Sequence, residues 1–80
     1  MKKLIAEYKS RVSDYDTLII ICQKEKTRLR GLLRSAKNEI SYNTIKEEVE
    51  ENNSELKKNQ ALRGRMFQVV VDLECLEVEE

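Results

Sequence analysis

Apolar side chains recur at steps of three and four residues along almost the whole chain, and this stripe changes phase only once. Its first part comprises eleven positions: Ile5, Tyr8, Val12, Tyr15, Ile19, Cys22, Lys26, Leu29, Leu33, Ala36 and Ile40. All of them except Lys26 are apolar or aromatic. Such spacing over five heptads is typical of a coiled coil and lacks the alternation of a β-strand. The pattern predicts one long helix over about residues 2–40.

The stripe then restarts two residues out of phase. Continuing the first part would place Asn43, Glu47 and Glu50, all polar, in the stripe. It resumes instead at nine other positions: Ile45, Val49, Asn52, Leu56, Asn59, Arg63, Met66, Val70 and Leu73. An offset of two residues, at about 100° per residue, moves the stripe to nearly the opposite side of a helix. We therefore expect the chain to break between the two parts.

Residues 41–44 have the composition of a turn followed by a helix start. Ser41 and Asn43 favour turns, and Thr44 followed by Glu47 fits a capping box. The sequence thus predicts a turn over 41–44 and a second helix over 45–78. The fold class is all-α, with residues 1–80 forming a single coiled-coil module, an antiparallel helical hairpin. The alternative is one continuous helix in a parallel dimeric coiled coil.

Charge is segregated between the two halves of the chain. Up to Ser41 there are ten Lys and Arg against five Asp and Glu, and from Tyr42 onward there are five against ten. An antiparallel arrangement places the basic stretch 24–37 beside the acidic residues 47–55, whereas parallel copies would place like charges side by side. The charges favour antiparallel packing, either within one chain or between two.

A reversal that faces Ile40 with Ile45 also predicts a register between the helices. The predicted pairs include Leu29 with Leu56, Lys26 with Asn59, Cys22 with Arg63, and Leu18 with Phe67. Asn52 and Asn59 are polar residues within the stripe. Such residues usually specify register and oligomer number at some cost in stability.

Only 40% of the residues are apolar, so we expect a single thin hairpin to need a partner. The chain is predicted to self-associate as a dimer. The predicted oligomer seam comprises Ile5, Tyr8, Val12, Tyr15, Ile19, Leu29, Leu33, Ile40, Ile45, Val49, Leu56, Met66, Val70 and Leu73. Six apolar residues flank this seam and form a candidate partner surface: Leu18, Ile20, Ile21, Phe67, Val69 and Val71. Such a patch suits either a second copy or another protein.

The sequence carries no recognisable catalytic or metal-binding set. There is no His, and Cys22 and Cys75 are too far apart to form a CxxC pair. We expect Cys22 to be a small buried apolar residue and Cys75 a surface thiol. We therefore expect no enzymatic activity, metal or cofactor. No apolar run approaches the roughly 20 residues of a membrane span. Two isolated cysteines favour the cytoplasm, a reducing compartment.

These features predict a non-catalytic scaffolding module that mediates self-association and protein–protein interaction. One alternative is a segment of a longer tether or cytoskeletal rod. Another is a regulatory adaptor that uses the basic stretch 24–37 to bind an acidic partner or nucleic acid. Leucines lie among those basic residues and an acidic segment balances them, which weighs against both nucleic-acid and membrane binding.

Overall fold

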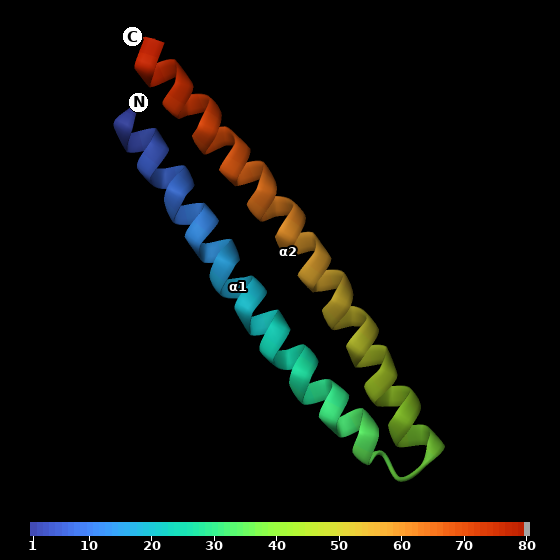
Figure 1. Cartoon of the computed structure of the whole chain (residues 1–80). Helices are drawn as coiled ribbons and strands as arrows, with labels where there is room; N and C mark the ends of the chain where they lie inside the picture. Colours follow the sequence, from blue (N-terminus) through green and yellow to red (C-terminus); the bar gives the residue numbers. More distant parts are fainter. Residues whose placement is uncertain (80) are drawn as a thin grey trace.

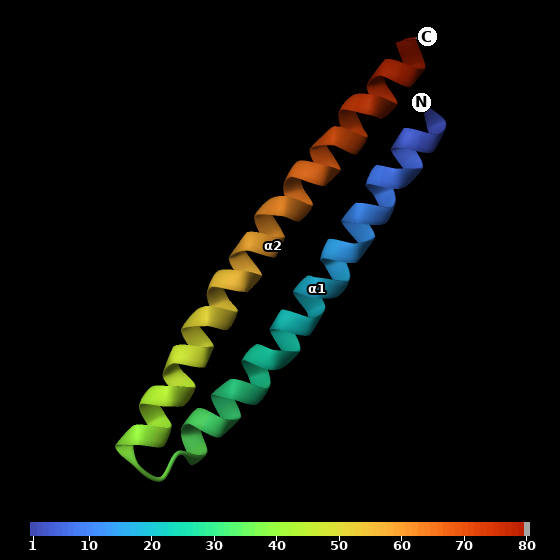
Figure 2. The ribbon, with the colours of Figure 1, turned by 180° about the vertical axis from the view of Figure 1, so that it is seen from behind.

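The computed structural model describes residues 1–79, which form two long helices, α1 (Lys2–Ser35) and α2 (Glu39–Glu79). The helices run antiparallel, side by side along their length (Figure 1 and Figure 2). The rod measures 64 × 14 × 13 Å. A single unbroken helix of this chain would extend about 120 Å, at 1.5 Å per residue. The predicted antiparallel helical hairpin is confirmed, and the alternative of one continuous helix is wrong.

The turn lies at residues 36–38, several residues before the predicted position. The first helix ends at Ser35 rather than near residue 40, and the second begins at Glu39 rather than at residue 45. Residues 41–44 lie inside α2. There the Thr44 hydroxyl donates a hydrogen bond of 2.8 Å to the carbonyl oxygen of Ile40. The predicted turn and the predicted capping role of Thr44 are therefore wrong.

The side chain that starts α2 belongs to Asn38. Its Oδ1 accepts a hydrogen bond of 2.8 Å from the backbone N–H of Ser41, and its carbonyl oxygen accepts one of 3.0 Å from Tyr42. Asparagine is among the best N-cap residues, and the negative charge of Glu39 in the first turn favours the helix dipole. Ala36 has an extended backbone, with φ −62° and ψ 126°, and this ends α1.

The core follows the stripe that the sequence predicts, with one exception. Five of the described residues are buried: Ile5, Cys22, Leu29, Asn59 and Val70. The remaining stripe residues are half-buried, apart from Ile40, which is 81% exposed. Ile40 belongs to α2, whose stripe extends back from Ile45 to the half-buried Ser41. An apolar Ile40 and a polar Ser41 made the first helix seem one turn longer than it is.

The register between the helices differs from the predicted one. Asn59 lies beside Cys22 instead of Lys26, with 3.7 Å between its Nδ2 and the Cys22 Sγ. Arg63 donates a hydrogen bond of 3.0 Å to Asp16, although it was expected beside Cys22. These partners lie four and six residues earlier in α1, a displacement of between one and two helical turns. Because stripe residues recur every three or four residues, the two stripes still face each other, but with different partners.

Replacement of Asn38 tests the observed helix start. We expect Asn38→Ala to lower the free energy of unfolding by about 1 kcal/mol, because the amide of Ser41 loses its side-chain acceptor. Asn38→Asp keeps an acceptor and should retain most of the stability. Urea unfolding followed by circular dichroism measures both. Equal losses in the two variants would show that Asn38 does not cap α2.

Candidate interaction surface

Two asparagines of α2 approach the backbone and thiol of one residue in α1. Asn52 Nδ2 donates a hydrogen bond of 3.0 Å to the carbonyl oxygen of Cys22. Asn59, only 5% exposed, places its own Nδ2 near the Cys22 sulfur. A buried amide without a partner costs about 1–3 kcal/mol, so sliding one helix along the other would be penalised here. These contacts fix the register of the hairpin.

The spacing of the buried residues assigns heptad positions a to g in both helices. In α1, Ile5 occupies position a and Tyr8 position d, while in α2 Ile45 occupies d and Val49 occupies a. In an antiparallel pair, the e positions of the two helices meet on one side of the seam and the g positions on the other. The two sides of this hairpin therefore have separate compositions.

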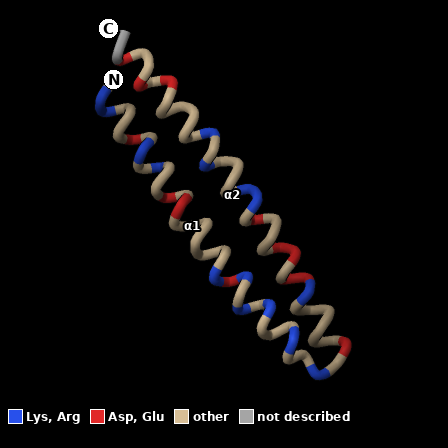
Figure 3. Tube along the Cα trace, in the orientation of Figure 1, with Lys and Arg blue, Asp and Glu red and all other residues tan. Residues whose placement is uncertain are grey.

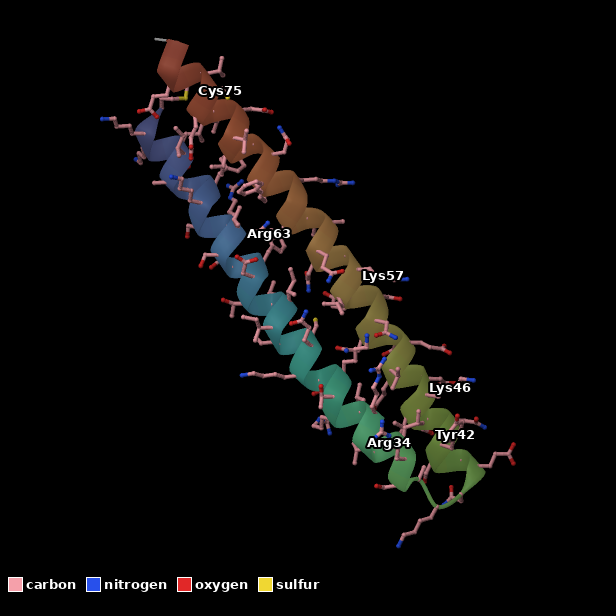
Figure 4. The ribbon with its side chains drawn as sticks, viewed as in Figure 1. Arg34, Tyr42, Lys46, Lys57, Arg63 and Cys75 are labelled. Atoms are coloured by element: carbon pink, nitrogen blue, oxygen red, sulfur yellow. The ribbon has the colours of Figure 1, made fainter. Side chains whose placement is uncertain are left out.

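The e side carries the ion pairs that join the helices. Lys9 and Glu74 both occupy position e, and the Lys9 Nζ lies 3.2 Å from Glu74 Oε1. The Arg63 Nε lies 3.0 Å from Asp16 Oδ1. The guanidinium of Arg63, labelled in Figure 4, also lies 5.2 Å from the centre of the Phe67 ring. Charged groups thus line this side of the seam.

The basic stretch 24–37 runs along α1 next to the glutamates of α2, as the charges in Figure 3 show. Within residues 1–79, no ion pair of 4.0 Å or less joins this stretch to residues 47–55. Arg28 pairs instead with Glu25, three residues earlier on the same helix. The hydrogen bond and charge of Glu25 raise the pKa of Arg28, and the charge of Glu48 adds to the effect. The two charged segments therefore interact through their fields rather than through direct pairs.

The Arg28 contact has a consequence for titration. The hydrogen bond from Arg28 lowers the pKa of Glu25 below its ordinary value of 4.5. This contact stabilises the fold above pH 4.5, and the stabilisation disappears as the pH falls through the lowered pKa. We expect Arg28→Gln to return the Glu25 midpoint to near 4.5 in an NMR titration of its side-chain carboxyl carbon. Arg30→Gln should leave the midpoint low. A Glu25 midpoint that is unchanged in Arg28→Gln would contradict the assignment.

The six residues of the predicted partner surface divide between the two sides of the hairpin. Ile20, Phe67 and Val71 occupy positions b and e, on or near the side that carries the ion pairs. Leu18 and Val69 occupy position g, and Ile21 at position c borders them. All six are exposed except Val69, which is half-buried. Because the partners of α2 residues lie four to six residues earlier in α1 than predicted, Leu18 no longer lies at the level of Phe67.

Four further apolar residues lie on the g side and were missed in the sequence: Leu4, Leu32, Leu62 and Leu76. Leu4 precedes Leu18 by two heptads in α1, while Leu62 and Leu76 flank Val69 by one heptad each in α2. Leu4 and Leu76 are exposed and Leu62 is half-buried. Each lies within three residues of a stripe residue, so its apolar character could not be told apart from that of the stripe. The seven-residue spacing of Leu62, Val69 and Leu76 was the signal that could have revealed them.

No group of three or more Cys, Asp or Glu side chains among the described residues is arranged to hold a metal ion. Of the cysteines, Cys22 is buried and Cys75 is exposed, and both are free thiols. In the described part of the chain, neither helix has a stretch long and apolar enough to cross a lipid bilayer. No protein-family model, curated protein or solved structure matches this chain.

Proposed function

We propose that this chain is a non-catalytic coiled-coil module that self-associates, as a homodimer, and brings other proteins together. The observation that carries the proposal is the number of large apolar side chains left on the outside of the hairpin. Those exposed in the middle and at the open end include Leu4, Leu18, Ile20, Ile21, Phe67, Val71 and Leu76. Exposed apolar surface on this scale marks protein–protein interfaces.

The surface area of the single chain supports this proposal. The hairpin exposes 6178 Å². A compact monomer of 9.4 kDa would expose about 5,000 Å² by the usual scaling of area with mass. The excess of about 1,200 Å² is of the size that a protein interface removes from water. Two free thiols fit a reducing compartment such as the cytoplasm, because neither cysteine is in a disulfide.

The measured mass in solution tests self-association. Light scattering coupled to size-exclusion chromatography, from low micromolar to several hundred micromolar protein, should give twice the 9.4 kDa of one chain at the upper end. The helical signal should strengthen over the same range, because association covers apolar surface. A mass of one chain at every concentration would contradict the proposal.

A second candidate function uses the basic stretch 24–37 to bind an acidic partner. The supporting observation is that, among the described residues, its cations make no direct ion pair with residues 47–55, and all of them except the half-buried Lys26 are exposed. Such binding should weaken steeply with salt and fail when Arg28, Arg30 and Arg34 are replaced by Glu. Binding to an acidic peptide or to single-stranded DNA that is insensitive to salt would remove this candidate.

A further inference from the structure

One side of the hairpin carries a group of apolar residues near the helix ends that are remote from the turn. We name it the open-end face, and it comprises Leu4, Leu18 and Ile21 from α1 with Leu62, Val69 and Leu76 from α2. The ion pairs that join the helices lie on the opposite side of the seam. Facing g positions place Leu4 across from Leu76 and Leu18 across from Leu62 in the observed register.

The composition of the g positions sets the limits of this face. The next g positions toward the turn are Glu25 in α1 and Glu55 in α2, and they are followed by Leu32 and Glu48. The single cation among the g positions near the open end is Arg11, whose guanidinium lies 4.7 Å from the centre of the Tyr8 ring. The g positions are thus mostly apolar in the open half of the hairpin, where Arg11 interrupts them, and mostly acidic in the half next to the turn, where Leu32 is the exception.

We infer that the open-end face is the surface on which a second copy of this chain docks. The inference rests on the proposed self-association and assigns it to one side of the molecule. A copy brings the same apolar patch, so an isologous contact matches apolar surface with apolar surface. The acidic half discourages contact beyond Glu25 and Glu55, because like charges at an interface are unfavourable.

The dimensions of the face are sufficient for a dimer. Two helices of about 10 Å diameter, lying side by side, present a side about 20 Å wide. Half of the 64 Å length then offers on the order of 600 Å² per copy. Two copies together would bury roughly 1,200 Å², the lower end of the range for specific interfaces. The area covered on each copy is about half of the excess area that one isolated hairpin exposes.

Two adjacent isoleucines provide a matched test. Ile21 belongs to the open-end face and is 56% exposed. Ile20 is 51% exposed, and its side chain points about 100° away from that of Ile21 around the helix axis. We expect Ile21→Glu to weaken dimerisation at least tenfold, a loss of about 1.4 kcal/mol. Ile20→Glu should change the dimer dissociation constant less than about threefold, which is under 0.7 kcal/mol. Sedimentation equilibrium measures both.

A second variant and a helicity measurement separate the possible failures. Leu18→Glu, also on the open-end face, should reproduce the loss of dimer, and circular dichroism at high concentration should show that all variants remain helical. A wild-type dimer that survives both Ile21→Glu and Leu18→Glu would overturn this interface while leaving self-association intact. Loss of the dimer in Ile20→Glu alone would assign it to the other side. A wild-type chain that stays monomeric would overturn both proposals.

Discussion

Leu29→Ala should cost about 2–5 kcal/mol of stability, the largest loss expected from any single truncation in this hairpin. Leu29 is 1% exposed, the lowest value of any described core residue. Its removal leaves a cavity that two rigid helices cannot close. Small folded units are stable by only about 5–15 kcal/mol. At room temperature the variant should therefore give a much weaker helical circular dichroism signal than the wild type, or none.

Leu32→Ala is the matched control, because it removes the same atoms three residues further along α1. Leu32 is 42% exposed, so we expect its truncation to cost less than about 1 kcal/mol. Thermal unfolding followed by circular dichroism at a fixed protein concentration compares the two variants. If both lowered the melting temperature equally, Leu29 would not occupy the core of the seam.

Thr44→Pro should cost about 3 kcal/mol or more, whereas Lys37→Pro should cost far less. Thr44 lies inside α2, where proline removes a backbone hydrogen bond and clashes with the preceding turn of the helix. Lys37 lies between the helices, and Ala36 before it already has the extended backbone that a residue preceding proline prefers. The comparison therefore locates the turn.

Urea unfolding midpoints of the two proline variants, measured against wild type, decide between the two positions of the turn. A turn over residues 41–44 would reverse the order, since residue 37 would then be helical. A loss of equal size in both variants would show that neither segment is a turn. The alanine substitutions Thr44→Ala and Lys37→Ala control for the loss of each side chain without the proline ring.

The helical content and the chain reversal could be predicted from the sequence because both depend on local chemistry. The stripe from Ile5 to Ala36 has the period of one buried helix side, and the stripe from Ile45 to Leu73 has the same period in another phase. Two phases require two helices that turn different sides toward a common seam. The segregated charges then favour an antiparallel pair over a parallel one.

The position of the turn was harder to read, because an apolar residue lay on the wrong side of it. Ile40 extended the first apolar stripe by one helical turn. In the structure Ile40 is exposed, and the half-buried residue at the start of α2 is Ser41. Asn38 carried a helix-start signal as strong as that of Thr44, but Asn38 fell within the apparent first helix. Residue type alone could not show whether Asn38 or Thr44 caps the second helix.

The interaction surface shows the same division. Leu18, Ile21 and Val69 were identified as candidate partner-surface residues from their position beside the seam. Their separation from Ile20, Phe67 and Val71 depends on which side of the pair each helix presents. That separation became visible from contacts such as the one between Lys9 and Glu74, which identify the e side.

The sequence by itself determined that this chain forms two amphipathic helices of opposite charge whose apolar stripes must face each other. Only the tertiary structure decided where the chain turns, which heptad of α1 lies against which heptad of α2, and which apolar residues share a side. The physical reason is that a heptad repeat looks almost the same after a shift of seven residues. Distinguishing the registers requires particular contacts, here the Asn52 and Asn59 amides at Cys22 and the Asn38 cap.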